Sequence, residues 1–215
     1  MIKQVKEVFE NIEKYKIVDD VTLVGVTKFR EVADIKKLVA LGVNNLGENR
    51  PQELRDKYDL IDNVNWHMIG RLQENKIKYV IERACLIHSV ADLKLASAIN
   101  KEAIKHNLVK EILLQINTSL EESKQGFDSN ELEDALKYCA TLSNIKVVGL
   151  MVMAPLVENE SIINDTFSKA HDLYNKYQEQ YHFKYLSMGM SHDYIIALKN
   201  GANMLRIGSL LFEED

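Results

Sequence analysis

Two kinds of hydrophobic segment alternate along this chain of 215 residues. The first kind is short, rich in β-branched residues and almost continuously apolar, which is typical of buried strands. The second kind is longer and carries apolar residues three or four positions apart, which is typical of amphipathic helices. Eight strands are predicted, at residues 21–26, 43–46, 65–69, 86–90, 111–117, 146–153, 185–188 and 203–207. Helices are predicted between them, at residues 31–41, 50–60, 72–82, 92–107, 129–142, 160–181 and 192–200, and another at 2–16 precedes the first strand.

This regular alternation of strand and helix predicts the fold class. Strand–helix–strand units form parallel sheets with right-handed crossovers. Eight such units predict an α/β fold, a single (β/α)8 TIM barrel over residues 1–215, with the leading helix covering the gap after the eighth strand. A doubly wound open sheet is the alternative, but its Gly-x-Gly-x-x-Gly phosphate motif is absent after the first strand.

Composition and charge exclude several classes of protein. Hydrophobic residues make up 46% of the chain and charged residues 27%, as in ordinary folded proteins and unlike disordered ones. With 27 basic and 32 acidic residues, a broad nucleic-acid-binding surface is not expected. No apolar run is long enough to span a membrane and the charged first residues do not suit a signal peptide, so we expect a cytoplasmic protein. Cys85 and Cys139 lie in apolar runs and are expected to be buried thiols, and no ligand spacing suggests a metal site.

In a parallel barrel the functional residues gather at the carboxyl ends of the strands, and Lys28 lies at the first of these ends. It follows an apolar run that should exclude water, so its ammonium group is expected to be partly desolvated. Desolvation lowers the pKa of a lysine, and the neutral amine can attack an aldehyde to form a Schiff base. The alternative is a lysine that extends to solvent or forms an ion pair.

The ends of the last two predicted strands carry small and hydroxyl-bearing residues. Gly189 and Gly208 allow the backbone to approach an anion closely, and Ser191 and Ser209 add hydroxyl donors. A helix predicted to begin near His192 would point free N–H groups at the same place. Barrels frequently bind phosphate with these two loops, so a phosphate site is predicted here. Two tight turns with N-cap serines are the alternative.

Two further polar side chains fall within apolar strands. Arg206 shares one side of its strand with Gly208, so it either lines the same cavity or pairs with a buried carboxylate such as Glu48. His67 is interpreted as a hydrogen-bonded core histidine. The run at residues 191–193, Ser-His-Asp, resembles a catalytic triad only in composition, because adjacent residues at a helix start do not face one another.

Seven ordered blocks connect these residues. They are Val24-Gly-Val-Thr-Lys28, Gly47-Glu-Asn49, Trp66-His-Met-Ile-Gly-Arg-Leu-Gln-Glu-Asn-Lys76, Ile116-Asn-Thr-Ser with Ser123-Lys-Gln-Gly126, Gly149-Leu-Met-Val-Met153, Leu186-Ser-Met-Gly-Met-Ser-His-Asp193 and Arg206-Ile-Gly-Ser209. Together they resemble the pyridoxal 5′-phosphate (PLP) homeostasis protein family, over about residues 21 to 212. The resemblance implies a barrel of the alanine-racemase-like N-terminal domain type, PLP fold type III.

The resemblance also implies roles for individual residues. Lys28 matches the lysine that holds the cofactor as a Schiff base, and Asn49 matches an asparagine near the cofactor ring. Arg206 matches the arginine that faces the pyridine nitrogen. The phosphate-binding positions are matched by Ser191, Gly208 and Ser209, the pocket wall by Met188 and Met190, and recurrent lysines outside the innermost pocket by Lys76 and Lys124. No catalytic residue and no metal ligand is implied.

Two positions depart from the family pattern. Phe29-Arg30-Glu31 follows Lys28 where relatives commonly have a nearby proline, so the loop after Lys28 is expected to differ. Phe212-Glu213 stands where relatives have Phe-Gly, which affects only the terminal loop.

The function implied is that of a non-catalytic carrier or buffer of PLP, expected as a monomer, with PLP-dependent apo-enzymes as recipients. An arginine beside the pyridine nitrogen disfavours its protonation, which makes the ring a poorer electron sink. A racemase of this type also needs a second acid or base from an additional domain, and the barrel uses all 215 residues. Two alternatives stay open: a PLP-dependent amino-acid racemase or lyase, with His67 as an acid or base, and a lysine-dependent aldolase acting on a sugar phosphate.

Overall fold

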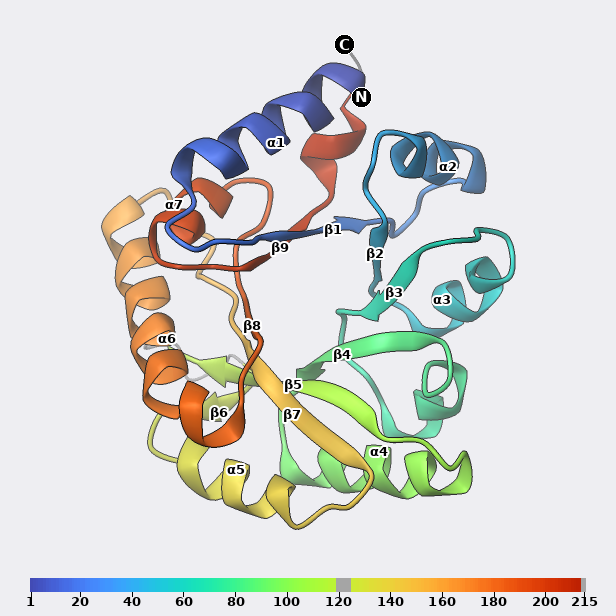
Figure 1. Ribbon diagram of the computed structural model, residues 1–215, viewed down its shortest axis with the longest axis vertical. Coiled ribbons are helices and arrows are strands. Elements are labelled where there is room, and N and C mark those ends of the chain that lie inside the picture. The colour runs from blue at the N-terminus through green and yellow to red at the C-terminus, as the bar shows by residue number, and fades with distance from the viewer. Residues whose placement is uncertain (119–124, 214–215) are drawn as a thin grey trace.

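Eight parallel strands close into a barrel in the computed structural model, which describes residues 1–118 and 125–213 (Figure 1). The strands are β1 (Thr22–Val26), β2 (Asn45–Glu48), β3 (Asn65–Met68), β4 (Ala84–Val90), β5 (Lys110–Asn117), β7 (Ile145–Met151), β8 (Tyr185–Ser187) and β9 (Met204–Ile207). Each pairs with the next in this order, and β9 pairs with β1, which closes the ring. The predicted (β/α)8 barrel is confirmed. A short strand that the sequence pattern missed, β6 (Phe127–Asp128), pairs with the end of β5.

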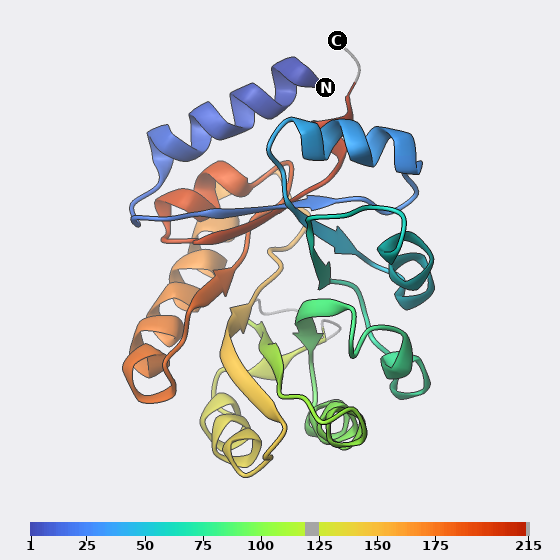
Figure 2. The same ribbon diagram turned by 45° about the vertical axis from the view of Figure 1, so that its right-hand side comes forward.

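Helices surround the barrel on its outside (Figures 1 and 2). They are α1 (Ile2–Tyr15), α2 (Val32–Ala40), α3 (Pro51–Tyr58), the 3₁₀-helix η1 (Glu74–Tyr79), α4 (Leu93–Lys105), α5 (Leu132–Ala140), α6 (Glu160–Tyr181), α7 (Tyr194–Lys199) and the 3₁₀-helix η2 (Ser209–Phe212). As predicted, α1 covers the region after the last strand, where it packs against α7 and η2. None of the described helices is long and apolar enough to cross a membrane.

Several predictions from the sequence differ from the structure. The segment predicted as a helix at 72–82 forms only the shorter 3₁₀-helix η1. The buried residues Ile77, in η1, and Val80 and Ile81, just after it, have the three- and four-residue spacing of an α-helix. Strand β2 begins at Asn45 because the N–H of Val43 still donates to the Leu38 carbonyl at the end of α2, at 3.4 Å. Cys139 is buried as predicted, but Cys85 is exposed, because it lies near the start of β4 at the end of the barrel where strands begin.

The hydrophobic core has two parts, because successive strand residues point to opposite faces. A small cluster fills the interior of the barrel with Val24, Leu86, Leu113, Val148, Met151 and Met204. A much larger cluster lies between the strands and the surrounding helices. Near the carboxyl ends of the strands the inward positions become polar, and this change creates the space in which the candidate site lies.

Candidate functional site

A pocket of about 460 Å³, here called the central pocket, opens at the carboxyl ends of the strands. Its size is within the range of small-molecule sites. Its walls are formed by Val26, Lys28, Asn49, Ile69, Gly70, Arg71, Ser89, Gln115, Gln125, Met153, Met190, Ser191, His192, Arg206, Gly208 and Ser209. Six of the seven residues predicted for the site therefore share one cavity: Lys28, Asn49, Ser191, Arg206, Gly208 and Ser209.

Met188 is the seventh, and the structure does not bring it to the others. Its side chain is completely buried in the outer hydrophobic core. Ser187 before it points into the barrel, so Met188 points outward. Met190, which the sequence also indicated, lines the pocket together with Met153.

The side chain of Lys28 is exposed, contrary to the desolvation predicted from the sequence. The reason is that β1 ends at Val26, so Lys28 lies two residues beyond the buried strand. The following residue, Phe29, has a left-handed backbone with φ of 61°, which turns the chain away from the barrel. Lys28 therefore lies at the mouth of the central pocket with its amine accessible.

A buried network anchors the backbone directly before Lys28. The hydroxyl of Thr27 donates to Glu48 Oε1 at 2.6 Å, and the ammonium of Lys57 donates to the same oxygen at 2.7 Å. Lys57 also donates to the Thr27 carbonyl at 2.9 Å. Glu48 is fully buried, and this burial raises its pKa despite the two hydrogen bonds. The network fixes the end of β1 against β2 and α3.

The same network distinguishes two lysines. The ammonium of Lys57 donates hydrogen bonds to the Thr27 carbonyl, to Glu48 and to Glu53 (3.3 Å). Lys57 does not line the central pocket. Lys28 does line the pocket. Among the described residues, Lys28 is thus the lysine placed to react with a molecule in the central pocket.

Ser191 joins the loops after β8 and β9. Its Oγ accepts hydrogen bonds from the N–H groups of Gly208 at 3.3 Å and Leu210 at 3.4 Å. A Cβ on Gly208 would lie 3.1 Å from Val26 Cβ, so glycine allows this loop to pass close to β1. Both N–H groups therefore donate to the Ser191 oxygen, and this holds the loops after β8 and β9 together at this end of the pocket.

The helix predicted at His192 begins two residues later. Asp193 Oδ1 accepts from the N–H of Met190 at 2.5 Å, and the N–H of Tyr194 donates to the Met190 carbonyl at 2.9 Å. The turn thus uses the N–H groups of Asp193 and Tyr194, two of those that the prediction assigned to anion binding, and α7 starts only at Tyr194. Donors at this end of the pocket therefore come from Ser191, Ser209 and the loop after β9.

Arg206 is 4% exposed and lines the central pocket. Its guanidinium donates to Ser187 Oγ at 2.7 Å and to the Val152 carbonyl at 2.9 Å. It does not pair with Glu48, contrary to one expectation from the sequence, because Lys57 and Thr27 bind that carboxylate. Burial lowers the pKa of Arg206 to about 10, so the group remains a fixed cation at neutral pH.

From Arg206 a chain of hydrogen bonds crosses the interior of the barrel. Ser187 Oγ lies 3.1 Å from His88 Nδ1, His88 Nε2 lies 3.0 Å from His67 Nδ1, and His67 Nε2 lies 3.1 Å from Asn45 Oδ1. His67 is 3% exposed and His88 is fully buried. The core interpretation of His67 therefore fits the structure, and its absence from the pocket lining disfavours a role as acid or base.

The direction of this chain follows from its two ends. Arg206 can only donate, so the Ser187 oxygen accepts and its own proton goes to His88 Nδ1. At the other end Asn45 Oδ1 accepts, so the proton of His67 resides on Nε2 and its Nδ1 accepts from His88. Both imidazoles are then neutral Nε2–H tautomers. Burial lowers the pKa of His67 to about 4 and lowers that of His88 well below its usual value.

We expect this chain to make the fold sensitive to acid. A histidine whose pKa is depressed by folding stabilises the protein above its unfolded pKa of about 6.5 and loses that contribution as the pH falls towards its folded value. For His67, with a folded pKa of about 4, the free energy of unfolding should fall by about 3 kcal/mol over this interval. Urea unfolding at a series of pH values measures the effect.

The exposed His192 supplies the control for this prediction. His192→Gln should leave the acid-dependent loss unchanged, whereas His67→Gln should reduce it. NMR of the imidazole nitrogens should show His67 and His88 as Nε2–H tautomers at neutral pH. Titration of His67 near its ordinary pKa would contradict the assignment.

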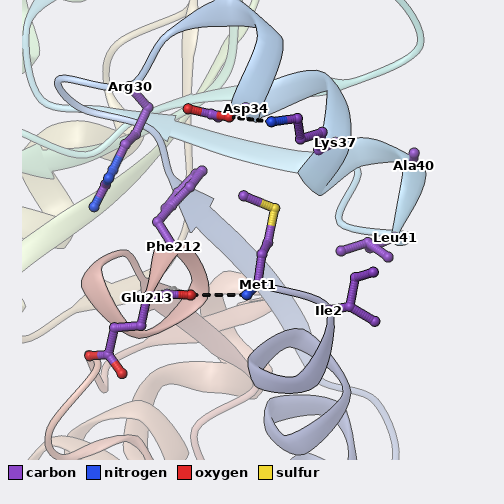
Figure 3. Close-up of a pocket in the computed structure, with 9 residues that line it drawn as sticks. All are labelled: Met1, Ile2, Arg30, Asp34, Lys37, Ala40, Leu41, Phe212 and Glu213. Carbon is purple, nitrogen blue, oxygen red and sulfur yellow. Dashed lines mark hydrogen bonds and ion pairs between the residues drawn. The ribbon is translucent and has the colours of Figure 1, made fainter. Parts of the chain in front are cut away.

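A second cavity, of about 580 Å³, lies between α1, α2 and the end of the described chain (Figure 3). Its charged side chains are largely engaged with protein groups: Asp34 pairs with Lys37 at 2.8 Å, and Arg30 lies 4.6 Å above the Phe212 ring. The Met1 amine donates to the Glu213 carbonyl at 2.9 Å. None of the predicted site residues lines this cavity, so the central pocket remains the candidate functional site.

Comparison with known proteins agrees with this fold. The family model for the alanine racemase N-terminal domain matches residues 5–214. A pyridoxal phosphate homeostasis protein from Aquifex aeolicus is 39% identical over 196 residues, which covers 89% of this chain and 86% of that protein. This chain belongs to the pyridoxal phosphate homeostasis protein family.

Solved structures place this family member among similar barrels. The structure of PipY from Synechococcus elongatus with PLP bound has a TM-score of 0.85 and 28% identity, and the match covers 99% of both chains. An alanine racemase from Clostridium difficile has a TM-score of 0.78 and 15% identity, and the match covers 99% of this chain and 60% of the racemase chain. The second similarity shows a shared fold.

Several residues of this family member escaped the sequence prediction. Gln125, with its amide oriented to suit its neighbours, accepts from Arg71 at 2.8 Å, and both side chains line the central pocket. No sequence pattern indicates that contact. His88 carried the same signal as His67, a histidine within an apolar strand, and could have been found by it. Lys124 lies outside the described residues.

Proposed function

We propose that this protein binds PLP as a Schiff base on Lys28 and acts in PLP homeostasis as a non-catalytic carrier or buffer. The observation that carries the proposal is the convergence, in one pocket, of an accessible lysine, a buried arginine and a group of hydroxyl and backbone donors. When bound, PLP supplies an aldehyde that condenses with a primary amine and a ring that can take up electrons. The PLP-bound structure of the similar PipY supports the same ligand.

Two groups of residues that line the pocket suit the two reactive groups of this ligand, its aldehyde and its phosphate. Lys28 provides the amine at the end of β1, held in place by the Thr27–Glu48–Lys57 network. Ser191 and Ser209 provide hydroxyl groups suited to a phosphate, beside the loop that contains Gly208. A phosphorylated aldehyde satisfies both groups of residues at once, whereas a plain phosphate satisfies one.

The position of Arg206 favours binding of the cofactor without catalysis. Its guanidinium is a permanent cation in the pocket wall, and a cation opposes the protonation of any basic nitrogen that faces it. An unprotonated pyridine ring is a weak electron sink, so carbanion chemistry is poorly supported. The hydrogen bonds to Ser187 and Val152 keep Arg206 in this position.

Reconstitution with PLP tests the proposal directly. The purified protein should acquire a visible absorbance band on addition of PLP, and borohydride reduction should fix the cofactor to the peptide that contains Lys28. Transfer of the cofactor to a PLP-dependent apo-enzyme, followed by the recovery of that enzyme's activity, tests the carrier role. Absence of the band in reconstituted protein would reject the proposal.

The alternative is a PLP-dependent amino-acid racemase or lyase that uses the same lysine. Solvent deuterium exchange at the α-carbon of a panel of amino acids separates the two functions. We expect no exchange above that of free PLP. Exchange that depends on Lys28 would instead establish an enzyme.

A further inference from the structure

A cavity of about 480 Å³, here called the outer cavity, lies beside the central pocket. Its walls are formed by Asn49, Arg50, Pro51, Gln52, Arg71, Gln73 and Lys76. Three of these seven residues are cationic and none is acidic, although the chain as a whole has more acidic than basic residues. The outer cavity is therefore a local concentration of positive charge on an acidic protein.

Nearby carboxylates leave most of this charge uncompensated. Glu74 pairs with Lys94 at 2.7 Å, on the outside of the barrel. Within residues 1–118 and 125–213, no carboxylate oxygen lies within 4.0 Å of the Arg71 or Lys76 cations. Arg71 faces the neutral amide of Gln125, and Lys76 lies 5.6 Å from the Tyr79 ring.

Of the three cations that line the outer cavity, only Arg50 contacts a carboxylate of the described residues. Its Nη1 lies 3.6 Å from Glu53 Oε1, and the other oxygen of that carboxylate lies 3.3 Å from the partly buried Lys57 ammonium. Glu53 is thus shared between two cations and neutralises Arg50 only in part. The guanidinium of Arg50 keeps donors that can reach an anion, because arginine has five N–H groups.

The outer cavity is contiguous with the central pocket, because Asn49 and Arg71 line both. We propose that the outer cavity is a binding subsite for a doubly charged anionic group, a phosphate or a dicarboxylate of a small molecule. Two guanidinium groups and one ammonium carry more positive charge than one carboxylate can neutralise, so they match a dianion better. Planar guanidinium groups bind phosphate and carboxylate oxygens in bidentate fashion. A ligand there lies next to whatever the central pocket holds.

This subsite does not require that the central pocket hold PLP, so it is tested on protein without added cofactor. Inorganic phosphate, succinate and acetate are titrated at low ionic strength, where exposed charges are least screened. The chemical shifts of the Arg50, Arg71 and Lys76 side chains report binding. Phosphate or succinate should shift these resonances in a saturable way, and acetate should bind much more weakly. Which of the two dianions binds more tightly identifies the source of the anionic group.

Lys76→Gln should weaken the binding of the preferred dianion by about tenfold, because it removes one charge-assisted hydrogen bond. Lys78→Gln is the matched control, since Lys78 is an exposed lysine of the same helix η1 that does not line the cavity. Arg50→Gln provides a second variant that leaves the central pocket lining unchanged. Ser191→Ala should leave this binding intact, because Ser191 lines the central pocket alone.

Three results would overturn the subsite. The first is that neither dianion shifts the three cationic side chains. The second is that Lys78→Gln weakens binding as much as Lys76→Gln, which would indicate diffuse attraction. The third is that Ser191→Ala removes the binding, which would place the anion in the central pocket. The PLP absorbance band is measured separately, so failure here leaves the proposed function untouched.

Discussion

Lys28→Ala is expected to abolish the visible absorbance band that the protein acquires with PLP. The variant removes the accessible amine that lines the central pocket, and the neighbouring Lys57 cannot replace it. Lys57 is held by Thr27, Glu48 and Glu53, and a reaction there would break three hydrogen bonds in a largely buried site. Absorbance spectra of the wild type and the variant with equal amounts of PLP measure the loss.

Lys78→Ala is the control for this prediction, because Lys78 is exposed and does not line the central pocket. It should keep the full band. Lys28→Ala leaves the residues proposed to bind the phosphate intact, so the variant should still bind PLP weakly without the covalent bond. If the variant keeps the band, the Schiff base belongs to another lysine and the assignment of Lys28 is wrong.

The barrel could be predicted from the sequence because its strands and helices carry different hydrophobic periods. Strands buried on both faces are nearly continuous apolar runs, and helices packed on them show a three- to four-residue period. Strand β6 lacks such a signal, since two residues are too few to show any period. The helix η1 has the signal of an α-helix, because both helix types place residues three apart on one side.

The candidate site could be predicted in part for a related reason. A parallel barrel brings the carboxyl ends of all its strands together, so polar residues at those ends were expected to share one pocket. The exposure of Lys28 could not be predicted, because it depends on the backbone turn at Phe29. The hydrogen-bond partners of Glu48 and Arg206 could not be predicted from the sequence either. Glu48 pairs with Lys57 because of where α3 packs against the barrel, and Arg206 pairs with Ser187 because that residue of β8 faces the interior.

Gly70 determines how closely the loops after β2 and β3 approach each other beside the pocket. A Cβ at this position would lie 2.3 Å from the Asn49 carbonyl oxygen and 2.6 Å from Asn49 Cα, which are backbone atoms that a side-chain rotation cannot move. The Gly70 carbonyl also accepts a hydrogen bond from the Ser89 hydroxyl at 2.5 Å. Asn49, Gly70 and Ser89 all line the central pocket, so a shift of this backbone changes the pocket wall.

Gly70→Ala is therefore expected to cost about 3 kcal/mol in the free energy of unfolding, since overpacking against the backbone forces the two loops apart. Displacement of Asn49 should also weaken PLP binding by about tenfold or more, because small displacements in a binding site are costly. Urea unfolding and a PLP titration followed by absorbance measure the two effects.

Gly42→Ala separates this steric effect from the general cost of replacing glycine. Gly42 has a left-handed φ of 95°, so alanine there is strained by about 1 kcal/mol, but an added Cβ would have no atom within 4 Å. It lies at the end of α2, away from the residues that line the pocket. Gly42→Ala should thus lower stability slightly and leave PLP binding unchanged. Equal PLP affinities for Gly70→Ala and the wild type would show that the position of Asn49 does not determine binding, which would remove Asn49 from the site.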